Sequence, residues 1–324
     1  MRRMKIVLLL AVPLCWIVYW VGTAQIAERY VGPWLEARPI GDAQLAHGGL
    51  SMAGFPHRFD LSVTRPQLFD ISGYGWSAPS MRMEAASYWP QDVTLRLPGT
   101  QQLHLPDDTV TVTSARLDGG ARLRPLNRLG LDALRLDAEQ LHLESRRGWT
   151  AGIGAGTVRM RRADGSGRHH DLTAEAQDII VPAALAGRAV PARIDHAALD
   201  ARLEFARPLD MDAADGVPPV VGLELHEGRL AWGRVEVRAA GALDVDAEGL
   251  PDGQITLGIT HWRDLLDLVE AAELLTGTQL ALAERALQSL EDRSGSENTV
   301  EAPLTLADGM IRLGPVPLAP IPRL

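Results

Sequence analysis

The residues of this chain with the greatest capacity for chemistry are few and scattered. His169, His170 and Asp171 are the only local group that could ligate a metal ion, and no HExxH spacing occurs. Successive residues of a strand point to opposite faces, so the two histidines cannot both bind one ion without a special turn. We therefore expect no metal site and no cofactor.

Motifs for nucleotide binding and nucleophilic catalysis are equally incomplete. Glycine occupies alternate positions of residues 152–156, but the GxGxxG spacing and a Walker lysine are missing. Gly165-Ser166-Gly167 lacks the flanks of a nucleophile elbow, and the carboxylates of Asp107-Asp108 suit a turn. We expect a protein that is not an enzyme. Small residues on a strand would instead leave room for close packing or for a ligand chain.

Composition indicates an acidic globular protein. The chain has 324 residues, 46% of them hydrophobic and 23% charged, and a formal net charge of −9. Its length allows one large domain or two small ones. Binding to nucleic acid normally needs clustered Lys and Arg. The only dense basic cluster, within residues 161–170, is interrupted by Asp164 and fits a solvated loop. We expect no nucleic-acid partner.

The amino terminus has the pattern of a membrane anchor. Arg2, Arg3 and Lys5 precede an apolar run over residues 6–21, and no charge follows until Glu28. The run approaches the roughly 17 to 25 residues that a spanning helix needs, and aromatic residues gather at its end as in an interfacial belt. We predict an anchor over residues 1–23. The alternative is a cleaved signal peptide with a weak site at residues 22–24.

The positive-inside rule then gives a location and a domain plan. It places the bulk of a single-pass protein across the membrane. We expect that membrane to be a bacterial inner membrane, with the bulk in the periplasm. The single cysteine, Cys15, lies inside the apolar run, so no intramolecular disulfide can form. Residues 24–47 read as an amphipathic connector, and residues 48–324 as a periplasmic mainly-β domain with a helical insert at about 262–292.

Short runs of alternating apolar and polar residues dominate this body. Residues 59–63, 93–97 and 110–113 are clear cases, and Gly, Pro and Asp separate the runs. This pattern is typical of half-buried antiparallel strands. The predicted fold is mainly β with minor α: a curved antiparallel sheet or meander with a carboxy-terminal helical segment, preceded by one transmembrane helix.

The strongest alternation, over residues 221–260, predicts strands with one apolar face and a turn at Glu227-Gly228. We treat this apolar face as a hypothetical lipid-binding surface. Its residues are Leu223, Leu225, Leu230, Trp232, Leu243, Val245, Ile255, Leu257 and Ile259.

Glycines and helical periodicity complete the prediction. Leu117-Asp118-Gly119, the segment ending at Gly228, and Leu306-Ala307-Asp308-Gly309 share a motif in which each glycine is expected to supply positive φ at a turn. Residues 262–275 and 280–293 carry apolar residues at three-and-four spacing, which predicts helices. These helices could cover the apolar face, which would then be core and not a binding surface.

Motifs near both ends of the body resemble those of a known family. One end reads Gly54-Phe55-Pro56-His57-Arg58-Phe59 and then Gly75-Trp76-Ser77-Ala78-Pro79, and the other reads Leu313-Gly314-Pro315-Val316-Pro317-Leu318. Together they resemble the opening and closing motifs of an uncharacterised proteobacterial family, domain of unknown function 2125. The resemblance spans almost the whole chain beyond the anchor and implies no catalytic residues.

A looser similarity is to the AsmA-like envelope proteins, through the strand rhythm at Gly228-x-Leu230 and Gly241-x-Leu243. It implies phospholipid handling by an apolar groove. We therefore expect a non-enzymatic protein that binds lipid or acyl chains, or helps to organise envelope lipids, with membrane lipids as partners. The alternative is an envelope scaffold or assembly factor that contacts other envelope proteins through a fully packed sheet, with Trp76, Tyr88 or Trp89 exposed as anchors.

Overall fold

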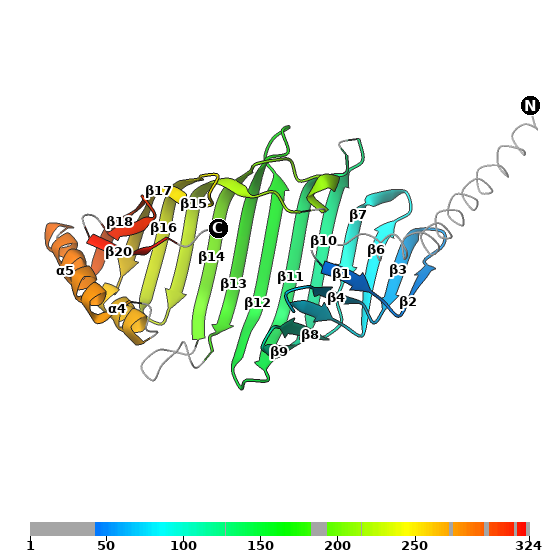
Figure 1. Cartoon of the computed structure of the whole chain (residues 1–324), viewed down its shortest axis with the longest axis horizontal. Coiled ribbons are helices and arrows are strands. Elements are labelled where there is room, and N and C mark those ends of the chain that lie inside the picture. Colours follow the sequence, from blue (N-terminus) through cyan, green and yellow to red (C-terminus); the bar gives the residue numbers. More distant parts are fainter. Residues whose placement is uncertain are drawn as a thin grey trace, which may run out of the picture.

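Alternating residues build one continuous antiparallel sheet of 20 strands (Figure 1). The computed structural model describes residues 43–126, 128–182, 193–214, 216–271, 275–294, 298–313 and 316–321. Within these residues, the sheet is accompanied by helices α4 (Trp262–Ala271) and α5 (Gly277–Ser294) and by the 3-10 helix η2 (Met211–Ala214). The predicted mainly β fold with a minor helical part is confirmed.

The predicted anchor, residues 1–23, and most of the connector lie outside the described residues. No described helix is both long enough and apolar enough to cross a bilayer. The last part of the predicted connector is already sheet, because Ala43–Ala46 forms β1 and pairs with β4.

Long strands that follow one another in sequence also lie next to one another in the sheet. They form the broad row at the centre of Figure 1, and each pairs antiparallel with the next. This is the predicted meander. The strands are β10 (Arg116–Arg124), β11 (Gly130–Ser145), β12 (Thr150–Arg162), β13 (His169–Ile180), β14 (Arg193–Phe205), β15 (Val220–Trp232), β16 (Val235–Val245) and β17 (Pro251–Thr260).

The sheet divides into two arms at β11, which pairs with β10 over its first part and with β9 at His142–Ser145. One arm continues from β10 through β7, β6 and β3 to β2, and the other from β9 through β8, β5 and β4 to β1. The short strands are β2 (Gly49–Ala53), β3 (Arg58–Thr64), β4 (Gln67–Asp70), β5 (Gly75–Ser77), β6 (Ser80–Ala86), β7 (Trp89–Arg96), β8 (Thr100–Leu105) and β9 (Asp108–Thr113).

The two arms meet again and close a ring of strands. The link from β3 to β4 lies beside the link from β5 to β6. There the Arg65 backbone N–H donates to the Pro79 carbonyl, and the Ala78 N–H donates to the Pro66 carbonyl. Val63 and Val110, from opposite arms, are each only 2% exposed. The amino-terminal end of the sheet therefore has its own small core.

Trp76 is half-buried in the second arm, and its Nε1 donates to Oε1 of buried Gln101 at 2.8 Å. This bond satisfies both polar groups away from water. The expectation that Trp76 is an exposed interface anchor is wrong, whereas Tyr88 and Trp89 are 72% and 54% exposed.

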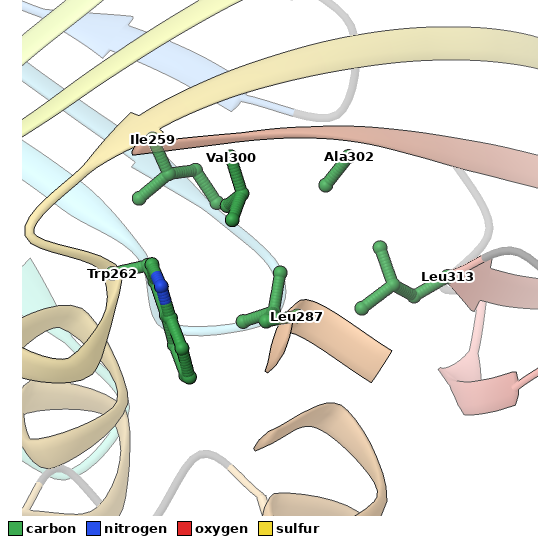
Figure 2. Packing of buried hydrophobic residues seen from close by; sticks show 6 residues of the cluster. All are labelled: Ile259, Trp262, Leu287, Val300, Ala302 and Leu313. Carbon is green, nitrogen blue, oxygen red and sulfur yellow. The ribbon is translucent and has the colours of Figure 1, made fainter. Parts of the chain in front are cut away.

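Helices α4 and α5 cover the other end of the sheet, next to β18 (Thr299–Ala307), β19 (Met310–Leu313) and β20 (Val316–Pro320). Figure 2 shows the core beneath them: Ile259, Trp262, Leu287, Val300, Ala302 and Leu313. Glu291 of α5 ties this end together by accepting hydrogen bonds from the Arg263 guanidinium and from the Asn298 backbone N–H. These bonds lower the pKa of Glu291 to about 2.

Two of the three predicted glycine turns are wrong. Gly119 lies inside β10, and Gly228 lies inside β15, where the pairing register shifts between Leu225 and Gly228 as in a bulge. A bulge accommodates extra residues while the strand continues in the same direction. The sequence at Gly228 therefore forms a bulge inside β15 and not a turn between two strands. Gly309, with φ of 71° between β18 and β19, is the turn that was predicted.

Candidate functional site

Cross-strand register gathers apolar residues into three uninterrupted rows on one face of the sheet, which we name the apolar face. Paired residues of an antiparallel ladder point to the same side, so the rows follow from the pairing. The first row is Leu95, Gly119, Leu136, Val158, Ala174, Leu199, Gly228, Ala239, Leu257 and Ala302.

The second row is Val93, Ala121, Leu134, Met160, Leu172, Ala201, Leu225, Gly241, Ile255 and Leu304. The third row is Leu117, Ala138, Gly156, Ala176, Ala197, Leu230, Val237, Ile259 and Val300. Every member of the three rows is apolar or glycine. The apolar face is therefore continuous from the amino-terminal ring to the helices.

The nine residues proposed from sequence all lie on this face. Leu225, Leu230, Ile255, Leu257 and Ile259 belong to the three rows. Leu223 pairs with Leu243, Trp232 with Val235, and Val245 with Pro251, which places them on the same side.

Part of this set is core. Ile259 is 4% exposed beneath the helices, Leu257 packs against the same cluster, and Trp232 packs against the buried pair Val235 and Leu268. The expectation that the helices could cover the apolar face is thus met at one end of the sheet.

The more open part of the apolar face lies over β11 to β14, although Ala138 and Ala201 within it are only 9% and 0% exposed. Leu136 is 39% exposed, whereas Ala302 in the covered part of the same row is 0% exposed. Leu134 in the second row is 38% exposed, whereas Val300 in the covered part of the third row is 1% exposed. The described helices pack mainly on β16, β18 and β20, and Figure 1 shows the long green strands between the two covered ends. This region is the candidate site.

Small residues make the middle of the open region shallow. Gly156, Ala176 and Ala197 follow one another in the third row, and Ala174 lies beside them in the first. Strands are about 4.8 Å apart, so β11 to β14 span roughly 14 Å. One leaflet of a bilayer is about 15 Å deep, half of the roughly 30 Å hydrocarbon core. An acyl chain fits across these strands.

Leu134 and Leu136 were not among the residues proposed for the site from the sequence. Their alternation at even positions ends before Gln140, which adopts φ of 50° inside β11, and the next leucines, Leu141 and Leu143, are at odd positions. The alternation of the flanking strand residues 153–160 was the available signal, because it continues the same face.

The opposite face is polar and its charges pair with one another. Arg202 donates to Asp171 at 2.8 Å, and Arg135 and Arg159 both approach the carboxylate of Asp137. Exposed pairs of this kind contribute little stability and keep a surface solvated. The sheet thus separates an apolar side from a charged side.

A segment that connects β14 to β15, residues 206–219, crosses the ends of the strands beside the apolar face. The Leu131 N–H donates to Leu209, and the Leu209 N–H donates to Gly167. Below this segment, His170 is fully buried, and its ring meets that of Phe205 edge-on at 5.7 Å between centroids. His169, by contrast, faces Asp164 and Glu204. The two histidines do not converge on a common ligand.

The burial of His170 predicts a pH-dependent stability. Burial lowers the pKa of this imidazole, and the positive charge of Arg162 acts in the same direction. The folded protein therefore holds His170 neutral, while the unfolded chain takes up a proton below its ordinary pKa of about 6.5. Stability is full above that pH and falls as the pH drops through it towards the folded pKa.

We expect urea unfolding of the wild type at pH 7.5, 6.5 and 5.5 to show a loss approaching about 1.4 kcal/mol per pH unit, the limit for one proton. His170→Leu should flatten this slope, because the group that titrates is gone. His226→Gln, at a largely exposed histidine, is the control and should keep the wild-type slope. Equal slopes in all three proteins would refute the assignment.

Comparison with known protein families gives a match over most of the chain. A family model described as "Uncharacterized protein conserved in bacteria (DUF2125)" matches residues 20–322. No curated protein and no solved structure matches the chain.

Proposed function

The chain belongs to the DUF2125 family of uncharacterised bacterial proteins, and from that premise we propose that the open apolar face binds the acyl chains of a lipid. The family resemblance read from the two terminal motifs is thereby confirmed, but it brings no activity with it. The proposal rests on the apolar rows themselves. In this proposal the protein binds lipid and catalyses no reaction.

The exposed leucines carry the proposal. Leu134 and Leu136 stand side by side in adjacent rows, with half-buried Val158, Met160 and Leu172 beyond them. A contiguous exposed apolar surface on a folded protein is normally an interaction site. Each buried CH₂ group stabilises a complex by about 0.8 kcal/mol, so a chain of many CH₂ groups is the ligand that gains most from a long apolar strip.

The proposed location is the periplasmic side of a bacterial inner membrane, with residues 1–23 as the anchor. A sheet held next to a bilayer by its amino-terminal end would receive lipid at β2 to β11 and could pass it along the three rows. The continuity of the rows across the strands supports such a path, in either direction.

The proposal predicts lipid at Leu136. A photo-crosslinking residue placed there in the full-length protein, expressed in bacterial cells, should form lipid adducts detected by mass spectrometry. The matched control is the same residue at Thr173, which is exposed on the polar face. In addition, Leu136→Asp should lower co-purifying lipid at least tenfold, since a carboxylate against acyl chains loses its hydration. Thr173→Asp should not.

Two results would change the conclusion. Absence of lipid at Leu136 in a normally folded protein would overturn the proposal. Adducts to another envelope protein at Leu136 would instead favour the alternative, a scaffold or assembly factor whose partner covers the apolar face.

A further inference from the structure

The polar face has a large hollow on the opposite side of the sheet from the proposed lipid surface. Its volume is about 930 Å³, within the roughly 300–1,000 Å³ of typical ligand pockets. Strands β3, β6, β7, β10, β11 and β12 surround it. Its lining includes Trp89, Arg122, Arg135, Arg159 and Arg161.

Positive charge is concentrated in this hollow. Five arginines line it, with Arg58 as the fifth, against the three carboxylates of Glu84, Asp92 and Asp132. The whole chain carries a net charge of −9. A positive site on an acidic protein is the reverse of what composition predicts and attracts anions locally.

Register fixes the arginines against one another. Arg135 is directly opposite Arg159, and Arg161 lies two residues further along the same strand. Like charges directly opposite on a sheet are destabilising. Asp137 is shared, at 3.0 Å from Arg135 and 3.4 Å from Arg159. One carboxylate therefore serves two guanidinium groups.

Arg161 adds an unneutralised charge. Its cross-strand neighbour Asp171 is engaged on the other side by Arg202 at 2.8 Å, and Arg161 forms no ion pair with any described residue. Arg122, across Ala133 from Arg161, pairs with Asp92 at 2.9 Å. Arg135, Arg159 and Arg161 therefore have the single paired carboxylate of Asp137 among them, and the group carries an excess of positive charge.

Exposed aromatic residues form the rim. Tyr88 and Trp89 lie at the turn between β6 and β7 and are 72% and 54% exposed. The turn is fixed by Ser87, whose hydroxyl donates to the Pro56 carbonyl at 2.8 Å. Aromatic rings with a polar edge suit the boundary between apolar and polar groups of a ligand.

We infer that the hollow binds a phosphate-bearing ligand, with Arg135, Arg159 and Arg161 contacting the phosphate oxygens and Trp89 contacting the group that the phosphate carries. Guanidinium groups bind phosphate in bidentate fashion. The hollow is far larger than one phosphate, which favours a substituted phosphate such as a glycerophospholipid headgroup. The arginines of this site lie on the opposite face from the acyl-chain rows, although Leu134 and Met160 of the second row also line the hollow.

The test uses ligands that have no acyl chains, so that failure of the proposed function cannot affect it. Binding of inorganic phosphate and of glycerophosphoglycerol to the full-length protein is measured by calorimetry at low salt. We expect the double variant Arg135→Gln/Arg159→Gln to weaken binding at least tenfold. The control is Arg229→Gln/Arg238→Gln, a pair of arginines that also face each other on the polar side but outside this hollow, and it should bind as the wild type does.

Each outcome decides the point. Tighter binding of glycerophosphoglycerol than of phosphate, reduced by Trp89→Ala, identifies a headgroup site. Equal binding of the two anions, still lost in the Arg135→Gln/Arg159→Gln variant, identifies a phosphate site. No binding by the wild type, or equal losses in both double variants, would overturn the inference.

Discussion

Replacing Trp262 by alanine should lower the free energy of unfolding by about 3–5 kcal/mol, the range for a large aromatic residue removed from a core. Trp262 is fully buried between the apolar face and α5, where it belongs to the cluster with Ile259 and Leu287 (Figure 2). The cavity left by the indole cannot collapse easily, because the paired backbones of β17 and β18 form one of its walls and cannot move inward.

Urea unfolding followed by circular dichroism measures this loss. Trp89→Ala is the matched control: Trp89 is 54% exposed, and an exposed substitution usually changes stability by less than about 0.5 kcal/mol. A loss below about 1 kcal/mol for Trp262→Ala would show that the helices do not depend on this core. The result bears on function, since these helices decide how much of the apolar face remains open.

Local patterns were sufficient to predict the central sheet and its single apolar face. Alternation has a period of two in any half-buried strand, so residues 221–260 reveal their face without tertiary information. The helices were predicted for the same reason, since Trp262, Leu265 and Val269 repeat at helical spacing. The alternation could not predict how much of the apolar face the helices cover, because that depends on where the helices pack on the sheet.

Long-range pairing was beyond local reasoning. The ring at the amino-terminal end depends on the pairing of β9 with β11 and of β5 with β8. Neither pairing can be predicted from the spacing of apolar residues. The phosphate hollow was missed for a related reason. Arg58, Arg122 and Arg159 come from separate segments, and each taken alone reads as an ordinary solvated residue on a polar face.

The two faces of the sheet would bind different parts of amphiphilic ligands. The rows through Leu136 and Leu199 offer apolar surface, and the hollow around Arg135 and Arg159 offers positive charge on the other side of the same strands. One lipid molecule cannot pass its headgroup through the sheet, so the two sites serve different molecules or different steps. Contact of the hollow with the headgroups of a bilayer, while the apolar face holds a chain, is consistent with both proposals.

Gly241→Ala should be the most disruptive substitution by a single methyl group on the apolar face. Gly241 of β16 adopts φ of 159°, and a Cβ there would lie 2.2 Å from the backbone oxygen of Gln254 and 2.8 Å from Cα of Ile255. Both neighbours are backbone atoms of β17 and cannot rotate away. We expect about 1–3 kcal/mol from the unfavourable backbone conformation and about 1–3 kcal/mol from overpacking.

The same change at Gly119 is the control. Gly119 lies on the apolar face in β10, its added Cβ would be 3.7 Å from the Leu95 Cβ, and its φ is not in the left-handed region. Gly119→Ala should therefore be neutral or stabilise by up to about 1 kcal/mol through a less flexible unfolded chain. If Gly241→Ala matches the wild type in urea unfolding, then β16 and β17 are not packed as closely as their pairing requires. Because these strands join the open part of the face to the helix-covered end, a destabilised Gly241→Ala protein should also retain less lipid than Gly119→Ala.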